Sequence, residues 1–466
     1  MSIRRERDTL GEVAVPEDAL YGAQTARAVE NFPISGLRPF PAFIRATVFV
    51  KKAAAAANLE AGRLPKELAD AITAACDEIL AGKHLDQFVV DVFQAGAGTS
   101  HNMNANEVIA NRANEILNAG GRGEYAKVNP NDHVNMAQST NDVTPTAIRL
   151  ALLDLTGPVI HELEQLGQAF AAKSNEYATT VKPGRTHLQD AVPITFGQEF
   201  GGWATRMRSA AARIKAGRVE LCELGIGGTA AGTGLNADPQ FAKRVCDHLA
   251  RWTHDPIVPS ADLFAAMQST AVFVRISSGM RTAAIELSSI ANDIRLMVSG
   301  PRTGFGELIL PAVQPGSSIM PGKVNPSIAE MVDQVCYQVI GNDTAVMLGA
   351  QAGQLELNVM MPGMNFALCF SATILANATR VFRTKAVDGM TVDKARTKEH
   401  VDSSPSLIVT ALAPHIGYAK AAALVKRALA ERRPLIDVAL EEKVLPEADL
   451  KRVLDPLPMT KGGVQS

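Results

Sequence analysis

The stretch Gly316–Pro326, GSSIMPGKVNP, combines two glycines, two prolines, two serines, one asparagine and one lysine. Apolar residues follow it at intervals of three and four, at Ile328, Met331, Val332, Val335 and Val339. This spacing predicts an amphipathic helix that begins where the loop ends. Free backbone N–H groups and partial positive charge gather at the start of a helix, so such a loop is suited to hold an anion.

Three further polar stretches each stand directly before a helical pattern. They are GAGTSHNMNANEV at 96–108, NPNDHVNMAQSTNDVTPT at 129–146 and KPGRTHLQDAVP at 182–193. Capping of the helix is the alternative interpretation of any single loop, and Asn325-Pro326 fits an N-cap followed by proline at the first helical position. Each loop, however, supplies several hydroxyl or amide groups and few charges. If the loops converge, they predict a site for a small polyanion such as a dicarboxylate.

The remaining sequence predicts a mostly α-helical protein. Long apolar-periodic runs extend from Ile148 to Phe170 and from Ile276 to Met297, and strands do not alternate with helices. We expect a long central helical bundle. The expected division is an N-terminal mixed helical domain at 1–141, a central bundle at 142–396 and a small, proline-punctuated C-terminal domain at 397–466.

Composition argues against several classes of function. The net charge is −2, from 46 basic and 48 acidic residues that are well mixed, and only 5% of residues are aromatic; we therefore expect no nucleic-acid partner. Five scattered cysteines and nine histidines show no metal-ligand spacing, so we expect no disulfide, no metal and no cofactor, and a cytoplasmic location. The uncharged run 358–379 contains Pro362 and Asn365 and is expected to be a buried core helix, not a membrane span. The glycine-rich stretch 225–234 follows a helical pattern, which argues against a dinucleotide site.

The loop GSSIMPGKVNP resembles the signature loop of the aspartase/fumarase superfamily. Further blocks resemble that family in the same order, among them GTSHNMNANEVIANRA, GRTHLQDAVPITFGQEF, GGTAAGTGLN and GQLELNVM. The resemblance implies a mostly α-helical protomer of three domains, with the long central bundle. It also implies a homotetramer in which loops of three subunits form each active site around a small dicarboxylate substrate.

Within the family, Ala97, Ser100 and Thr140 resemble aspartate ammonia-lyases, because class II fumarases typically read GSGTQSNMN and QSSND in these loops. The segment AGQLELNVMMP at 352–362 has the same tendency, although Met361 stands where many aspartases carry an acidic residue. Gly227–Thr229 and HIGYAKAA, at 415–422, resemble fumarases instead. The resemblance favours deamination of aspartate, with hydration of fumarate as the alternative. A non-catalytic homologue, as among lens crystallins, is the third reading, and the intact signature loop counts against it.

The resemblance also implies roles for individual residues. Deamination removes a proton from the carbon beside the β-carboxylate and leaves an aci-carboxylate, whose charge the site must stabilise. Ser317 would be the base, carried on a lid hinged at Gly316 and Gly322 and made more acidic by Lys323 and helix-end N–H groups. The resemblance implies that His187 and Lys323 are catalytic as well; His187 would orient the leaving amine or, in a fumarase, help to protonate the leaving hydroxyl, and a structural histidine is the alternative. The implied substrate-binding residues are Thr99, Ser100, Ser139, Thr140, Asn141, Thr186, Ser318 and Asn325. Lys323, Asn325 and Thr186 would hold the α-carboxylate, and Asn141 and His187 would lie near the amino group.

Two further positions concern the surroundings of this site. The resemblance implies that Glu330, on the first turns of the helix after Lys323, pairs with His187 and sets its charge; an ordinary surface carboxylate is the alternative. Asn129, Asn131 and Asp132 match a secondary carboxylate site of fumarases. Asn129 stands where those enzymes often have histidine, so we do not expect that site here.

Overall fold

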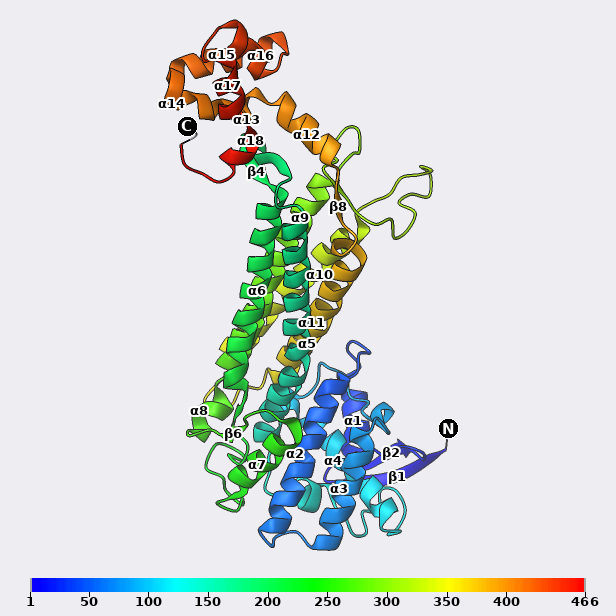
Figure 1. The fold of residues 1–466 in the computed structure, drawn as a ribbon. Helices are drawn as coiled ribbons and strands as arrows, with labels where there is room; N and C mark the ends of the chain where they lie inside the picture. Colours follow the sequence, from blue (N-terminus) through cyan, green and yellow to red (C-terminus); the bar gives the residue numbers. More distant parts are fainter. Residues whose placement is uncertain (1, 465–466) are drawn as a thin grey trace. The chain divides into compact units, whose positions relative to one another are not determined.

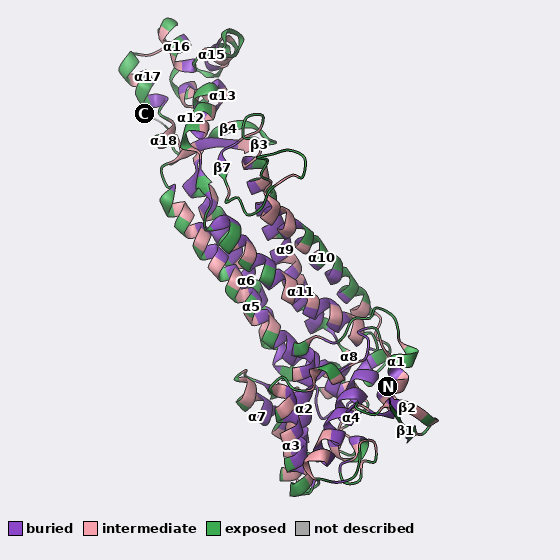
Figure 2. Ribbon diagram, turned by 90° about the vertical axis from the view of Figure 1, so that its right-hand side faces the viewer, coloured by how far each residue is buried: buried purple, intermediate pink, exposed green. Residues whose placement is uncertain are grey.

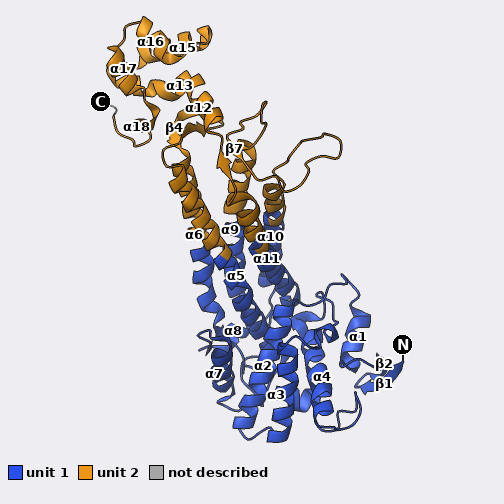
Figure 3. Ribbon diagram, turned by 45° about the vertical axis from the view of Figure 1, so that its right-hand side comes forward, with its two compact units in different colours: residues 1–161, 211–284, 336–376 blue, residues 162–210, 285–335, 377–466 orange. Residues whose placement is uncertain are grey.

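The computed structural model describes residues 2–464, and their contacts group into two compact units (Figure 3). Unit 1 comprises Met1–His161, Ala211–Ala284 and Cys336–Ala376, and unit 2 comprises Glu162–Ala210, Ile285–Val335 and Asn377–Ser466. The unit boundaries fall inside five long helices, which Figure 1 labels α5 Thr140–Glu176, α6 Phe196–Leu221, α9 Ala271–Met297, α10 Ser327–Gln351 and α11 Met361–Phe382. The mostly α-helical fold with long bundled helices is confirmed, whereas the three-domain division stays a prediction.

One part of unit 1 consists of packed helices and a short hairpin. Strands β1 Ile3–Asp8 and β2 Gly11–Pro16 pair antiparallel, and the helices are α1 Ala23–Asn31, α2 Pro41–Glu60, α3 Lys66–Leu80, α4 Thr99–Ile116 and α7 Phe241–Thr253. α2 packs against α3, α4 and α7 around a core that includes Val48, Ile72 and Ile109. Alanine-rich sequence and a proline at the first position favour α2 as a helix.

Short elements connect these helices in unit 1. The single-turn helices are η1 Leu85–Gln87, η2 Gly96–Gly98, η3 Pro130–Val134 and α8 Leu263–Gln268. The two-residue strands β5 Glu223–Leu224 and β6 Val258–Pro259 pair in parallel. β5 thus separates α6 from the glycine-rich loop that begins at Gly225.

The long helices contact one another through their facing sides in each unit. In unit 1, Ile214 of α6 lies against Gly279 of α9, and Asn342 of α10 donates to the hydroxyl of Ser371 of α11 at 2.9 Å. In unit 2, Phe170 of α5 makes an edge contact with Trp203 of α6. The facing sides are buried, as Figure 2 shows. α5 is the one described helix that is long and apolar enough to cross a membrane, and 72% of its most apolar window is buried within the structure, as expected for a core helix.

Unit 2 contains a hairpin, the signature loop and a group of short helices. Strands β3 Val181–Thr186 and β4 Gln189–Thr195 form the hairpin, and β7 Leu308–Ile309 pairs with β8 Thr391–Val392. The short helices are η4 Arg383–Val387, α12 Lys394–Ser403, α13 Pro405–Val409, η5 Thr410–Leu412, α14 Ala413–Ile416, α15 Tyr418–Glu431, α16 Leu435–Glu441, α17 Glu447–Val453 and α18 Pro456–Met459. The last of these helices share a small core of their own, which includes Leu424, Val438 and Leu450.

Candidate active site

The first polar loop is a tight turn that leads directly into α4. Ala97 and Gly98 both have positive φ, 60° and 87°, and a Cβ on Gly98 would lie 2.8 Å from the hydroxyl oxygen of Thr144. Glycine is therefore needed at this position. Gly98 has no side chain to cap the helix. Thr99, which is exposed, and Ser100, which is buried, open it, and the N–H of His101 donates to Gln94 Oε1 at 2.7 Å. The N–H of Ala97 donates to the carbonyl of Val359 at 3.2 Å and ties the turn to the GQLELNVM segment.

The second polar loop ends in a reciprocal cap at the start of α5. The hydroxyl oxygen of Ser139 accepts from the N–H of Asn141 at 3.2 Å, and Asp142 Oδ1 accepts from the N–H of Ser139 at 2.9 Å. Exchange of this kind is a capping box. Thr140 Oγ1 accepts from Asn102 Nδ2 on α4 at 3.1 Å, so the two polar helix starts are bonded to each other. The structure thus brings Ser139, Thr140 and Asn141 onto one turn beside α4.

Asp142 also fastens the glycine-rich loop to this turn. Its Oδ2 accepts from the N–H groups of Gly227 at 3.0 Å and Thr229 at 2.9 Å, and Asn141 Nδ2 donates to the carbonyl of Ala230 at 2.8 Å. Burial raises the pKa of Asp142 to about 7, although its three backbone N–H bonds and the charge of Lys51 pull it down. The carboxyl is therefore a fully enclosed connector of two loops.

The third polar stretch is a β-hairpin, which corrects the expectation of a loop placed directly before a helix. Val181 pairs with Thr195 and Thr186 with Gln189, and the β-branched residues of the two strands favour extended backbone. His187 and Leu188 form the two-residue turn with φ of 55° and 58°, a conformation that normally favours asparagine and glycine. Strained backbone of this kind is concentrated at functional sites. Thr186 and His187 are exposed at the tip of this hairpin.

A buried carboxylate holds the hairpin close to its tip. Glu307 has no exposed side-chain surface, and it accepts from Arg185 at 2.6 and 3.0 Å and lies 2.7 Å from His400 Nδ1 on α12. Burial alone would raise the pKa of Glu307, but the bonds from Arg185 and His400 hold it below its usual value. The residue directly before Thr186 is therefore held in place by an enclosed ion pair.

The fourth loop, GSSIMPGKVNP, is closed by its own hydrogen bonds. The N–H of Gly316 donates to the carbonyl of Lys323 at 2.8 Å, and Asn325 Nδ2 donates to the carbonyl of Gly316 at 2.7 Å. A Cβ on Gly316 would lie 2.5 Å from that lysine carbonyl, so only glycine fits there. Ser317 Oγ accepts from two backbone N–H groups, of Ile319 at 3.2 Å and Met320 at 2.9 Å. Two N–H donors on one hydroxyl oxygen stabilise negative charge on it.

Other residues of this loop differ in part from expectation. Ser318 and Lys323 are exposed. α10 begins at Ser327, one residue later than predicted, and Asn325 closes the loop instead of capping the helix. Glu330 lies half-buried on the first turn of α10. Within residues 2–464, no ion pair joins Glu330 to His187, and no hydrogen bond joins the side chains of Thr186 or His187 to the fourth loop.

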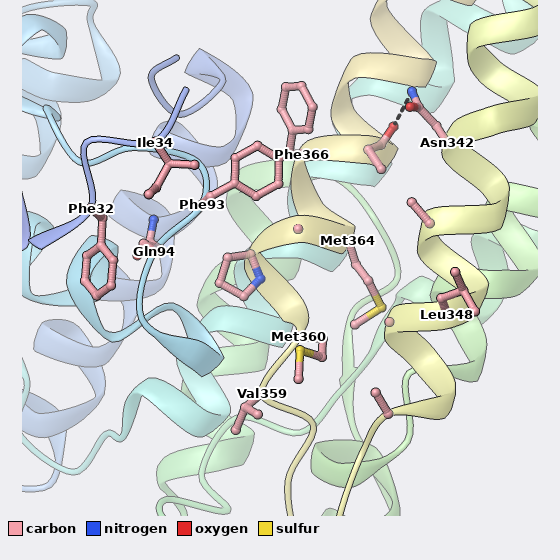
Figure 4. A pocket seen from close by; sticks show the side chains of 16 residues that line it. Phe32, Ile34, Phe93, Gln94, Asn342, Leu348, Val359, Met360, Met364 and Phe366 are labelled. Carbon is pink, nitrogen blue, oxygen red and sulfur yellow. Dashed lines mark hydrogen bonds between the residues drawn. The ribbon is translucent and has the colours of Figure 1, made fainter. Parts of the chain in front are cut away.

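An apolar pocket in unit 1 contains none of the predicted site residues. It encloses about 750 Å³ in unit 1 and is lined mostly by apolar side chains of α10, α11 and the segments around Phe32 and Phe93 (Figure 4). Gln94 and Asn342 are its polar side chains, and neither is charged. A dicarboxylate needs charged or N–H partners, so this pocket is unsuited to the predicted ligand. Among residues 2–464, no group of three His, Cys, Asp or Glu side chains is placed to hold a metal ion.

Asn129 has a structural role. Its side-chain oxygen accepts from the N–H groups of Asn131 and Asp132, at 2.8 and 3.1 Å, and it caps η3 with Pro130 at the first position. The N-cap followed by proline that we expected at Asn325 is found here.

Three supporting residues were missed in the sequence. The role of Asp142 could have been predicted in part, because Ser139 and Asp142 have the serine-x-x-acid spacing of a capping box. Lys51 interrupts the apolar and alanine-rich run VFVKKAAAAA, and it is fully buried. Glu307 has no local signal, because both its partners are distant in sequence.

Comparisons with known proteins identify the family of the chain. A family model described as lyase matches residues 11–341, and one described as fumarase C C-terminus matches residues 408–461. The chain is 46% identical to an aspartate ammonia-lyase from Bacillus sp, over 99% of this chain and 98% of that protein. It is also 46% identical to a class II fumarate hydratase from Xylella fastidiosa, over 99% of this chain and 96% of that protein.

A solved structure is equally similar over its whole length. The crystal structure of a fumarate lyase:delta crystallin from Brucella melitensis, bound to cobalt, is 49% identical and superposes with a TM-score of 0.95. The superposition covers 98% of this chain and 100% of that one. Full-length identity of this degree, the lyase family model and the signature loop at the start of α10 all agree: the chain belongs to the lyase family, as a member of the aspartase/fumarase superfamily.

Proposed function

We propose that this chain is an aspartate ammonia-lyase that interconverts L-aspartate with fumarate and ammonia. Ser317 Oγ takes the proton from the carbon beside the β-carboxylate, the electrons move onto that carboxylate as an aci-carboxylate, and ammonia then leaves. The observation that carries this proposal is the pair of backbone N–H groups directed at Ser317 Oγ. A hydroxyl becomes a base only as its alkoxide, and these N–H groups stabilise that charge.

The remaining residues take the roles of an anion site. Thr99, Ser139 and Thr140 lie at helix starts, where hydroxyls and free N–H groups suit the doubly negative carboxylate. Lys323 and Asn325, with Thr186, are proposed to hold the α-carboxylate, and Asn141 and His187 to lie near the amine. Ser100 and Ser318 complete the set of polar contacts. Glu330 does not pair with His187 within the described protomer, so its proposed effect on the charge of His187 requires a contact between subunits.

Amine rather than water is proposed as the leaving group because of the loop residues. Overall identity does not discriminate, since the relatives named aspartate ammonia-lyase and fumarate hydratase are both 46% identical to this chain. Ala97, Ser100 and Thr140 resemble the aspartase pattern. Ala97 is bonded through its N–H to the aspartase-like segment around Val359. Fumarate hydration is the second candidate, favoured by Gly227–Thr229, whose N–H groups bind Asp142 in the same region.

We infer that the working form is a homotetramer in the cytoplasm, with active sites shared between subunits. α10 exposes the large apolar side chains of Tyr337, Met347 and Leu348, and Leu348 also lines the apolar pocket shown in Figure 4. Exposed large apolar side chains that gather on one helix are consistent with a surface that another subunit covers. Contacts between subunits would also supply the convergence of loops that the proposed site needs.

The test of the proposed function measures the ultraviolet absorbance of fumarate, with aspartate alone and with malate alone. Fumarate from aspartate only is the expected result, and fumarate from malate only would overturn the choice of leaving group. Ser317→Ala should lower kcat by about 10²- to 10⁴-fold, the usual contribution of a general base, while the tetramer persists. The control is Ser278→Ala, because the Ser278 hydroxyl donates to the carbonyl of Arg275 within α9. Unchanged turnover in Ser317→Ala would exclude the serine base.

A further inference from the structure

Lys51 on α2 is fully buried, and its side chain bonds to the second polar loop. Its ammonium donates to Asn135 Oδ1 at 2.9 Å and to Gln138 Oε1 at 3.0 Å. Both acceptors are neutral, and among residues 2–464 no carboxylate lies within ion-pair distance of it. Burial lowers the pKa of Lys51 to about 7, and the charge of Asp142 opposes this. A buried charge without a bonded partner charge lowers stability, so packing does not explain a lysine here.

The lysine determines which way the neighbouring amides face. An ammonium only donates hydrogen bonds, so Asn135 must present its oxygen to Lys51. The same oxygen accepts from Asn102 Nδ2 at 3.3 Å and from Asn106 Nδ2 at 3.2 Å. Asn102 is therefore turned with its NH₂ towards Asn135, and its Oδ1 is buried without a hydrogen-bond partner among the described residues.

This orientation reaches the proposed substrate site through one more hydrogen bond. The NH₂ of Asn102 also donates to Thr140 Oγ1 at 3.1 Å. Because the threonine oxygen already accepts from the amide, its own hydrogen is left to donate to another group. A donating hydroxyl at the start of α5 is suited to a carboxylate, whereas an accepting one would repel it.

We propose that Lys51 is a positioning residue that sets the direction of the hydrogen bonds through Asn135 and Asn102, so that the Thr140 hydroxyl donates to a substrate carboxylate. This inference rests on the proposed function in one respect, namely that the ligand at Thr140 is a dicarboxylate. Fumarate is common to the ammonia-lyase and the hydratase reactions, so binding of fumarate tests Lys51 whichever leaving group is correct.

The first test measures the Kd of fumarate by calorimetry for wild type, Lys51→Met and Thr140→Val. Each variant should weaken binding at least tenfold, the effect of about one oriented hydrogen bond to a charged group. The double variant should bind no more than about threefold more weakly than Thr140→Val, because the two residues act through one bond. Lys52→Met, on the same helix but paired with Asp77, should bind as wild type does. Independent, multiplying effects would overturn the proposal.

A second pair of variants leaves Lys51 in place and covers the case in which Lys51→Met does not fold. Asn135→Asp and Asn135→Leu both lose the bond that Asn135 Nδ2 donates to the Gln138 carbonyl at 3.3 Å. Only Asn135→Asp keeps an acceptor towards Lys51 and Asn102, so it should bind fumarate more tightly than Asn135→Leu. Asn135→Leu removes the acceptor and should weaken binding at least tenfold. Equal binding by these two variants would refute the inference. Wild-type protein that binds fumarate but forms it only from malate would overturn the proposed ammonia-lyase and leave the role of Lys51 standing, whereas wild type that binds no fumarate would overturn both.

Discussion

Removal of the Asp142 carboxyl should loosen two loops at once. In Asp142→Ala the N–H groups of Ser139, Gly227 and Thr229 lose their acceptor. An unsatisfied buried donor costs about 1–3 kcal/mol, so three would cost roughly 3–9 kcal/mol if none found another partner. Removal of the carboxyl offsets part of this cost, because burial disfavours its charged form and raises its pKa to about 7. We expect a local destabilisation of about 3 kcal/mol.

Hydrogen–deuterium exchange can locate this effect. About 3 kcal/mol corresponds to roughly 10²-fold faster exchange in peptides that cover residues 225–234, because local opening governs exchange. Asp142→Asn should exchange less rapidly than Asp142→Ala. Its amide oxygen can still accept from Gly227 and Thr229, and only the N–H of Ser139 then faces another donor, the amide NH₂. Asp393→Ala, which removes a helix-capping carboxylate in unit 2, should leave these peptides unchanged. Exchange within threefold of wild type in Asp142→Ala would refute the reasoning.

Two further carboxylates give separate predictions. Glu307→Gln leaves Arg185 buried without a counter-charge, so we expect a loss of roughly 3 kcal/mol and a clear fall in melting temperature and kcat/KM, whereas Glu399→Gln, at an exposed pair, should change neither. Glu78 is the acid-sensitive case: its bond from Arg112 lowers its pKa from 4.5 to about 2, so its contribution is present above about pH 4.5 and is lost as the pH falls towards 2. Glu78→Gln should therefore be less stable than wild type by about 1–2 kcal/mol at pH 7, after allowance for partial exposure, and denaturant unfolding should show this difference vanish near pH 2.

Local patterns in the sequence were enough to predict the long helices and the ends of some loops. Spacings of three and four residues identified α5, α9 and α10, because one helix face recurs with that period. The hairpin at 181–195 was missed, since its polar turn concealed the β-branched residues on either side. The start of α10 was predicted one residue early, because Asn325 bonds to Gly316, nine residues before it, and not to the helix. The loop closes on itself, and adjacent residues alone do not reveal that.

Local patterns could not predict the roles of the buried charges Lys51 and Glu307, and the reason is physical. Lys51 meets its partners 84 and 87 residues later in the chain, and Glu307 meets Arg185 122 residues earlier. Each contact exists only once the helices have packed, so no window of adjacent residues contains both members. Asp142 is the exception, because one of its three bonds is made within its own capping box.

The hydrogen bonds that the hydroxyl oxygens of the proposed site accept distinguish the proposed donors from the proposed base. Ser139 Oγ and Thr140 Oγ1 each accept one bond from the protein, at 3.2 and 3.1 Å, and each keeps its hydrogen for a ligand. Ser317 Oγ accepts two backbone N–H bonds, one of them at 2.9 Å. Donated bonds stabilise negative charge, so the hydroxyl with two of them is the one best able to release its proton. These bonds support the proposed roles, in which Ser139 and Thr140 donate to a carboxylate and Ser317 accepts the substrate proton.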